Sequence, residues 1–215
     1  MTKNETVVTP KGTAIFPTLN EPDKKFNPEG TYKVTLRLTE EEAAPLIAKL
    51  TKIHSEAQAV ELKKLGKKNI KLAPMPWADA TNYDKETETK VPVDGFVDFK
   101  FSLKAVVKTK AGKSWEQRPM LFDAKLNPIP ADSDKVGGGS VIRVNAEVYP
   151  WFSASLGFGI SLRCRSVQVL ELKTYGSKDA TSFGFSAEDG YETDGEANPF
   201  ASKEQAAVGD GSPDF

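Results

Sequence analysis

The chain of 215 residues contains only one cysteine and one histidine. The scarcity of these two residue types limits the disulfides, metal sites and catalytic sites that the chain can form. A single cysteine cannot form a disulfide within the chain, which fits a protein of a reducing compartment. His54, the only histidine, has no second histidine or cysteine partner that would suggest a metal site. Gly-x-Ser-x-Gly, P-loop, His-Glu-x-x-His and Cys-x-x-Cys motifs are absent from the sequence. We therefore expect a binding protein and not an enzyme, with no catalytic residues, no metal and no cofactor.

Long uncharged runs are also missing. The longest one, Val148–Leu162, has 15 residues. Pro150, Gly157 and Gly159 interrupt it, so it is too short and too broken to span a bilayer. The first six residues lack the apolar core of a signal peptide. These features predict a soluble, cytoplasmic protein that has no membrane partner.

The net charge of −1 conceals a strong asymmetry along the chain. Residues 176–215 carry nine Asp or Glu and two Lys, a net charge of −7, which leaves 27 Lys or Arg and 21 Asp or Glu, a net charge of +6, for residues 1–175. Val208 is the one aliphatic residue larger than alanine in the acidic part, which therefore cannot bury enough apolar surface to fold. We predict a basic folded domain over 1–175 and a disordered acidic tail over 176–215.

Strict alternation of apolar and polar residues predicts four strands, over 31–38, 95–107, 141–148 and 159–172. Tyr32, Val34 and Leu36 exemplify the apolar face of the first strand. In the last strand the alternation slips by one residue at Ser166, which indicates a bulge of the kind that curls a sheet into a barrel. Basic residues occupy the polar faces of these strands: Lys33, Arg37, Lys100, Lys104, Arg143, Arg163 and Arg165.

One long helix is expected at about 40–65, packed against the barrel. Thr39 and Glu42 form a capping box, and Gly66 is a natural C-terminal stop. Leu46, Leu50, Ile53 and other apolar residues recur between them at helical spacing. Pro45 lies late for a first-turn proline, so a start at Ala44 remains an alternative. His54 lies on this helix, where a structural role is expected.

Aromatic residues concentrate in the segments that we expect to connect the strands. Residues 73–94 are interpreted as a loop, in which Trp77 is either a lid over the core or a platform for stacking. Residues 149–159 form an aromatic connection rich in proline and glycine. A basic hairpin turn at 108–113 leads into a returning strand at 115–122. The candidate stacking residues are Trp77, Trp115, Tyr149, Trp151 and Phe152.

Basic strand faces flanked by exposed rings are typical of proteins that bind single-stranded nucleic acid. Lysine and arginine follow the phosphates, and flat rings stack on bases without regard to sequence. The alternative for each strand is an ordinary solvated polar face, and the alternative for each ring is burial in the core. The repetition of the pattern over several strands favours a nucleic-acid groove.

The chain resembles the single-stranded DNA-binding proteins of short-tailed phages that carry their own replication machinery. The matching features are spread over most of the sequence and include Gly12-Thr-Ala14, Pro28-x-Gly-x-Tyr-Lys-Val-x-Leu36, Phe99-Lys-Phe101, Gly137-Gly-Gly-Ser140, Gln168-Val-Leu-Glu-Leu172 and a terminal Asp214-Phe215. The resemblance implies a mainly β protein with an OB-fold, a five-stranded partly open barrel, beside one long inserted helix and a disordered acidic C-terminal tail.

The resemblance also implies a function. Such a protein coats single-stranded DNA during phage DNA replication, recombination and repair in the cytoplasm of the infected bacterial cell. The tail, through Asp210, Asp214 and Phe215, would contact the replicative DNA polymerase and the helicase/primase, and two copies can form a homodimer. The tail, as a polyanion, would also compete with DNA for the basic groove.

Two other functions are compatible with parts of the sequence. A β-barrel with a flexible tail can be a non-catalytic protein-interaction or structural virion component, and this alternative expects charge reversal at Arg143 and Arg163 to leave function intact. A metal-dependent nuclease would need a cluster of carboxylate ligands, but the acidic residues gather in the tail and at the helix cap.

Overall fold

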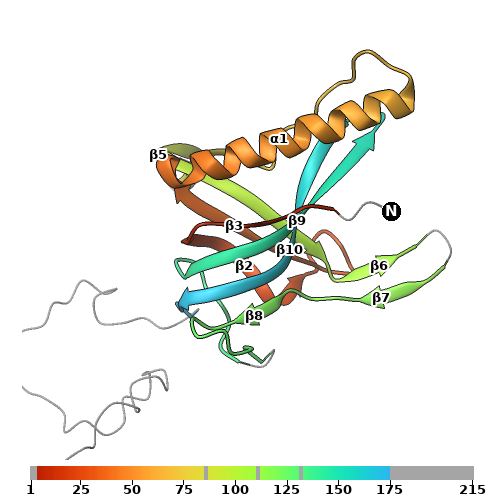
Figure 1. Ribbon diagram of the computed structural model, residues 1–215. Coiled ribbons are helices and arrows are strands. Elements are labelled where there is room, and N and C mark those ends of the chain that lie inside the picture. The colour runs from red at the N-terminus through yellow and green to blue at the C-terminus, as the bar shows by residue number, and fades with distance from the viewer. Residues whose placement is uncertain (1–3, 85–86, 110–111, 131–132, 175–215) are drawn as a thin grey trace, which may run out of the picture. The chain divides into compact units, whose positions relative to one another are not determined.

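A computed structural model describes residues 4–84, 87–109, 112–130 and 133–174. The described residues are mainly β-strand, with one helix (Figure 1). The elements are β1 Thr6–Val8, β2 Gly12–Asp23, β3 Thr31–Thr39, α1 Glu40–Leu65, β4 Trp77–Asp84, β5 Thr89–Lys104, β6 Val106–Lys108, β7 Ser114–Glu116, β8 Met120–Phe122, β9 Val141–Ser153 and β10 Gly157–Glu171. The predicted acidic tail, with Asp210, Asp214 and Phe215, lies outside the described residues.

Five strands close into the barrel that the sequence predicts. The pairing order runs β9, β2, β3, β5 and β10, and the additional pairing of β9 with β10 completes the ring. β5 and β10 run parallel, whereas the other neighbours in the ring are antiparallel. β1 adds to β9, β4 adds to β5, and β8 adds to the far end of β10, while β6 and β7 form a separate two-stranded sheet. This closed five-stranded arrangement is an OB-fold.

The bulge predicted in the last strand is present. The β9–β10 register shifts between Cys164 and Ser166, so that Arg165 is the extra residue of β10. A bulge bends its strand and increases the local twist, which helps to close the barrel. Cys164 points into the core, where burial raises the pKa of its thiol to about 12.

Apolar residues that alternate along the barrel strands fill its interior. Leu36, Phe99 and Ile142 are fully buried there, each on a different strand. A buried Leu, Ile or Phe side chain contributes about 1.5–3 kcal/mol relative to an exposed one. Because the period-two pattern sends these residues inward, it sends the intervening lysines and arginines outward.

The helix α1 begins and ends where the capping signals predict. Thr39 Oγ1 accepts a hydrogen bond from the Glu42 backbone N–H at 3.3 Å, and Gly66 adopts the left-handed conformation with φ 62°. The alternative start at Ala44 is wrong, since Pro45 lies inside the helix. Pro45 cannot donate the helical hydrogen bond to the carbonyl of Glu41, and because Glu41 is exposed, water can satisfy that carbonyl. Buried residues of α1 pack toward β3, β5, β9 and β10 (Figure 1).

Two segments that are predicted from the sequence to be loops form strands in the structure. Residues 73–94 contain β4 and the first part of β5, which pair as an antiparallel hairpin. The aromatic connection 149–159 is largely the β9–β10 hairpin, in which Trp151 pairs with Gly159 and only residues 154–156 form the turn. Proline, glycine and exposed charges hide the alternation in both segments, whereas long-range pairing with a neighbouring strand imposes the extended conformation.

The first strand and the returning strand also differ from expectation. β2 occupies Gly12–Asp23, a segment outside the four strands that alternation predicts. The expected strand at 115–122 is divided into β7, which pairs with β6, and β8, which pairs in parallel with β10. Pro119 lies between the two pieces and cannot donate a ladder hydrogen bond. Among the residues that the structure describes, no helix is both long enough and apolar enough to cross a membrane.

Candidate nucleic-acid interface

The outer surface of β3, β5 and β10 carries most of the predicted basic residues. One cross-strand row runs from Lys33 on β3 to Ser102 on β5 and on to Arg163 on β10. Lys100 and Lys104, on the same face of β5 as Ser102, are exposed. Arg165 adds a further exposed cation at the bulge of β10. We call the surface formed by Lys33, Lys100, Lys104, Arg163 and Arg165 the basic face.

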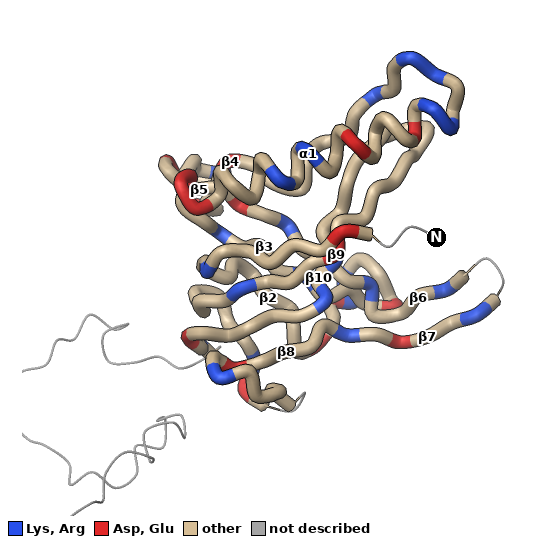
Figure 2. The backbone as a smooth tube through the Cα atoms, in the orientation of Figure 1, with Lys and Arg blue, Asp and Glu red and all other residues tan. Residues whose placement is uncertain are grey.

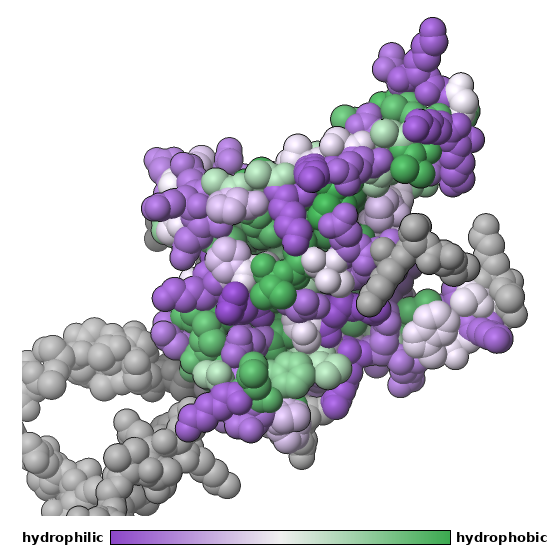
Figure 3. Space-filling model, viewed as in Figure 1, coloured by the Kyte–Doolittle hydropathy of each residue, from purple (hydrophilic) through white to green (hydrophobic). Residues whose placement is uncertain are grey.

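Figure 2 shows lysines and arginines distributed along the barrel strands, with another group in the segment that follows α1. Hydrophilic side chains lie among apolar ones over the same strands in the space-filling view (Figure 3). Positive charge beside apolar contact area suits a ligand made of phosphates and flat bases.

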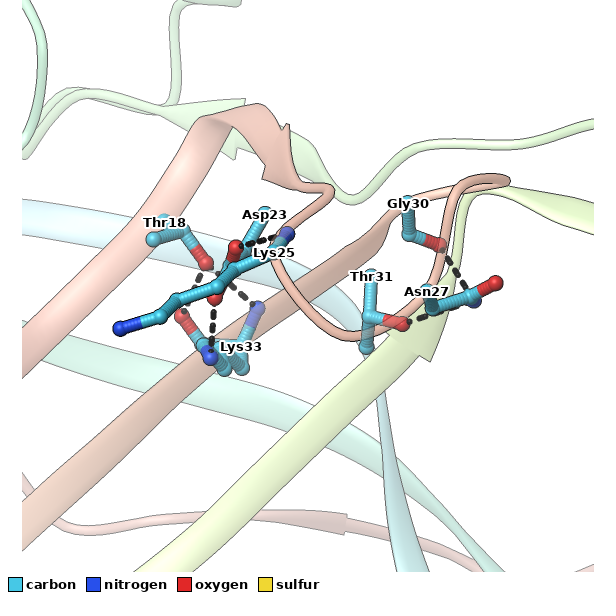
Figure 4. A network of polar contacts seen from close by, with 7 residues as sticks. All are labelled: Thr18, Asp23, Lys25, Asn27, Gly30, Thr31 and Lys33. Carbon is cyan, nitrogen blue, oxygen red and sulfur yellow. Dashed lines mark hydrogen bonds and ion pairs between the residues drawn. The ribbon is translucent and has the colours of Figure 1, made fainter.

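Lys33 belongs to a polar network that orders the turn between β2 and β3 (Figure 4). Its ammonium contacts Asp23 Oδ2, and its backbone N–H donates to Thr18 Oγ1 at 3.2 Å. Asp23 Oδ1 accepts a hydrogen bond from the Lys25 backbone N–H at 2.8 Å. The hydrogen bond from Lys33 is the largest cause that lowers the pKa of Asp23. The network fixes the position of Lys33 while its side chain remains 44 % exposed.

The turn itself is held by Asn27. Its side-chain amide donates to the Gly30 carbonyl and to Thr31 Oγ1, both at 3.3 Å (Figure 4). Phe26, next to it in the turn, is 84 % exposed, and the Lys25 ammonium lies 5.4 Å from the centre of its ring. Phe26 is not among the candidate residues predicted from the sequence, although Lys24-Lys25-Phe26 combines positive charge with an aromatic ring.

Arg163 and Tyr149 stack on each other. The guanidinium carbon lies 3.2 Å from the centre of the Tyr149 ring, across the β9–β10 pair. A cation on a ring face is favourable by about 0.5–1 kcal/mol at an exposed site. The stack covers one face of the Tyr149 ring. The planar guanidinium of Arg163 remains available for contact with a ligand.

Arg37 is engaged by other groups of the chain. Its Nε and Nη2 donate to both carboxylate oxygens of Asp98, at 2.8 and 2.9 Å. Nη1 donates to Asn82 Oδ1 at 2.7 Å, and the side chain is 11 % exposed. The hydrogen bond to Asp98 is the largest cause that raises the pKa of Arg37. These contacts tie the β4–β5 hairpin to β3 and leave Arg37 little capacity for a phosphate.

Arg143 and Arg165 have partial partners. Arg143 Nε donates to the Thr9 carbonyl at 3.2 Å, and Arg165 Nε lies 3.2 Å from Glu147 Oε2. Both arginines nevertheless remain exposed, and the Arg165 side chain is 51 % accessible. Glu147 is only 14 % exposed, but both guanidinium groups reach the surface, where a phosphate can compete with these single contacts.

The predicted aromatic residues divide into two groups. Trp77 and Trp151 are partly buried: Trp77 packs on Phe99 with ring centres 6.1 Å apart, which favours a lid over the core. Trp151 lies against Gly159, where a Cβ would come within 2.8 Å of its ring. Phe152 and Trp115 are 38 % and 48 % exposed, but Trp115 belongs to the separate β6–β7 sheet.

No group of three His, Cys, Asp or Glu side chains that could hold a metal ion occurs in the described ranges. His54 contacts the Phe158 ring, with ring centres 5.1 Å apart, and burial lowers its pKa. The expected structural role of this histidine agrees with its 4 % exposure.

A closed five-stranded barrel with a basic outer face is an OB-fold protein of the kind that binds oligonucleotides or oligosaccharides. The model of one family, described as "Single-stranded DNA-binding protein, Bacteriophage T7", matches residues 12–172. The chain belongs to that family.

Individual relatives agree with this membership. The chain is 26 % identical over 173 residues to the single-stranded DNA-binding protein of Enterobacteria phage T3, covering 76 % of this chain and 72 % of that protein. It is 25 % identical over 178 residues to the protein of the same name from Escherichia phage T7, covering 80 % and 75 %.

Solved structures share the fold. The crystal structure of gp2.5, a single-stranded DNA-binding protein encoded by bacteriophage T7, matches with a TM-score of 0.64 and 23 % identity over 88 % of this chain and 99 % of that chain. The single-stranded DNA-binding protein from bacteriophage Enc34, in complex with single-stranded DNA, matches with a TM-score of 0.53 and 13 % identity over 80 % and 89 %.

Proposed function

We propose that this protein binds and coats single-stranded DNA during phage DNA replication, recombination and repair, in the cytoplasm of the infected cell. The observation that carries the proposal is the basic face, on which Lys33, Lys100 and Arg163 gather from three neighbouring strands of the barrel. Membership of a family of single-stranded DNA-binding proteins supports it. The role is one of binding and needs no catalytic group.

The chemistry of the basic face suits binding without sequence specificity. Lysine and arginine neutralise phosphates and release counterions, so affinity falls steeply as the salt concentration rises. Bases then stack on flat groups, each stack being worth about 1–3 kcal/mol. We assign phosphate contacts to Lys33, Lys100, Lys104, Arg143, Arg163 and Arg165, and base contacts to Tyr149, Trp151 and Phe152.

Three predicted residues have different roles in this proposal. Arg37 positions the β4–β5 hairpin through Asp98 and does not contact DNA directly. Trp77 closes the core beside Phe99. Trp115, on the β6–β7 hairpin, would reach DNA only where the strand extends beyond the barrel.

The test is a salt series of binding to labelled oligo-dT, measured by fluorescence anisotropy. The double variant Lys100→Gln/Lys104→Gln should bind more weakly and with a shallower dependence on salt, because two phosphate contacts are lost. Lys49→Gln/Lys52→Gln is the matched control, since it removes the same charge from exposed positions of α1. Absence of binding by the wild-type protein at low salt would refute the proposal.

We further propose that the acidic tail recruits the replicative DNA polymerase and the helicase/primase through Asp210, Asp214 and Phe215. The net charge of −7 over residues 176–215 supports this assignment, because an acidic segment that contains an aromatic residue such as Phe215 offers both charge and an apolar anchor. A chain that ends at Tyr175 should bind oligo-dT more tightly than the full chain, because the acidic tail no longer competes with DNA for the basic face, and it should lose co-purification with the phage polymerase. Sedimentation velocity on the same samples tests the homodimer that the resemblance implies.

A further inference from the structure

Phe16 has a backbone conformation that a bulky residue seldom adopts. Its φ is +48°, in the left-handed region, and it directly precedes Pro17. A residue before proline is normally extended, and a non-glycine residue with positive φ is strained. Strain of this kind persists only where the surrounding structure enforces it, and it is found preferentially at functional sites.

A bulge in β2 enforces this conformation. Ile15 pairs with Thr35 and Thr18 pairs with Lys33, so Phe16 and Pro17 together oppose the single residue Val34. Pro17 is buried, as is Val34 across from it. The extra residue of the bulge is therefore Phe16, which is turned outward.

The outward-facing ring of Phe16 is unusually exposed to solvent. Phe16 is 75 % exposed, although burial of a phenylalanine side chain is ordinarily worth about 1.5–3 kcal/mol. Its opposite residue, Val34, is buried on the inner side of the sheet and therefore does not cover the ring. The strained backbone at Phe16 thus keeps an aromatic ring exposed to solvent.

The ring stands beside the basic face. Its strand neighbours Ile15 and Thr18 pair with Thr35 and Lys33, and across β3 these face Lys100 and Ser102 of β5. Among the described residues only Phe26, in the turn between β2 and β3, has a more exposed ring, at 84 %, whereas Arg163 stacks on Tyr149 and Trp77 packs on the core.

We propose that Phe16 is a base-stacking residue of the single-stranded DNA site, with Lys33 and Lys100 holding the adjacent phosphates. This inference rests on the proposed function and adds to it the β2 side of the binding surface. A flat ring next to cations is the combination that binds a base and its phosphate together.

The experiment compares four variants at Phe16 in oligo-dT binding and in thermal unfolding. Phe16→Gly removes the ring and also relieves the strain, because glycine accepts a positive φ without cost. Phe16→Leu keeps an apolar side chain but has no flat ring, whereas Phe16→Tyr keeps the ring. Phe16→Trp places an indole where its fluorescence reports stacking. Leu126→Gly is the matched control, because Leu126 also has a positive φ of 68° and is 68 % exposed, in the turn after β8.

We expect Phe16→Gly and Phe16→Leu to weaken oligo-dT binding by about 5- to 150-fold, the range that corresponds to one lost stack. Phe16→Tyr should retain the wild-type affinity, and DNA should quench the fluorescence of Phe16→Trp by more than that of the wild type, which already contains three tryptophans. Phe16→Gly should unfold at the wild-type temperature or above it, which separates a binding role from a folding role. Leu126→Gly should bind as the wild type does.

Two results would overturn the inference while the proposed function stands. One is wild-type affinity in both Phe16→Gly and Phe16→Leu, which would leave the ring free for a protein partner. The other is wild-type affinity in Phe16→Leu alone, which would indicate apolar contact without stacking. If the wild-type protein itself fails to bind oligo-dT, the proposed function fails and the inference fails with it.

Discussion

Arg37 and Asp98 form a two-bond ion pair between adjacent strands, with Nε–Oδ1 at 2.8 Å and Nη2–Oδ2 at 2.9 Å. They are direct cross-strand partners on β3 and β5, and their side chains are 11 % and 12 % exposed. A paired and largely buried arginine stabilises the sheet and is poorly placed to meet a phosphate.

Arg37→Lys should therefore lower stability more than DNA affinity. Lysine cannot form the two parallel bonds, and loss of charge-assisted hydrogen bonds of this kind costs about 1.5–3 kcal/mol. The free energy of unfolding in urea measures the first effect, and oligo-dT anisotropy on the folded variant measures the second. Lys100→Gln should show the reverse pattern. A large loss of affinity in Arg37→Lys without loss of stability would contradict the structural role.

His54 should make the protein less stable at mildly acidic pH. Burial lowers the pKa of His54 in the folded state below its usual value of 6.5. As the pH falls below 6.5, the unfolded state therefore binds a proton more readily than the folded state, and stability declines down to the folded pKa. Above pH 6.5 His54 is neutral in both the folded and the unfolded state, so its contribution to stability does not change with pH.

The titration can be assigned without ambiguity because the chain has one histidine. The imidazole resonance should titrate below 6.5 in the folded protein. In urea unfolding at several pH values, the wild type should lose more stability than His54→Gln between pH 6.5 and the pKa of His54. Parallel pH curves for the two proteins would show that His54 has no such effect.

Gly157 should be far less tolerant of a side chain than Gly95. Both glycines have a positive φ, of 97° and 78°, so alanine strains the backbone at either position. At Gly157 a Cβ would also lie 2.2 Å from the Lys71 carbonyl oxygen, whereas nothing lies within 4 Å at Gly95. Gly95→Ala should cost about 1–2 kcal/mol.

Gly157→Ala should cost at least about 1 kcal/mol more, because the segment at Lys71 must move away from the hairpin. That segment is held by a hydrogen bond from the Phe158 N–H to the Lys71 carbonyl at 2.8 Å. Unfolding in urea compares the two variants directly. Equal losses of unfolding free energy in the two variants would show that the segment at Lys71 moves away from the hairpin without an energetic cost.

Cys164 should be unreactive in the folded protein. The thiol is fully buried and its pKa is raised to about 12, so the reactive thiolate is scarce at neutral pH. A disulfide reagent should label Cys164 in denaturant at once and in native buffer only as fast as the core opens. Because it is the single cysteine, its labelling rate also reports the stability of variants. Rapid labelling in native buffer would disprove the burial.

Local signals in the sequence were sufficient for much of the fold. The helix limits follow from Thr39, Glu42 and Gly66, whose interactions reach only three or four residues along the chain. The core strands follow from strict alternation, and the slip at Ser166 correctly predicted the bulge at Arg165. These features are short-range, so a single sequence contains them.

Segments with weak local signals were interpreted wrongly. β4 and the outer part of the β9–β10 hairpin contain proline, glycine or scattered charge, and their extended conformation depends on the strand beside them. Pairing with a neighbouring strand supplies the backbone hydrogen bonds of these segments, and the local sequence pattern does not predict that pairing. The same is true of β8, whose partner β10 is more than forty residues away in the chain.

The sequence by itself determined the mainly β class, the helix and the outward direction of the basic residues, because periodicity and capping act between near neighbours. Only the tertiary structure decided which of those residues are free. Arg37 and Lys100 occupy equivalent polar positions in their strands, yet Arg37 meets Asp98, 61 residues away, and Lys100 remains exposed. The bulge that exposes Phe16 likewise depends on the register of β2 against β3, in which Ile15 pairs with Thr35 and Thr18 pairs with Lys33.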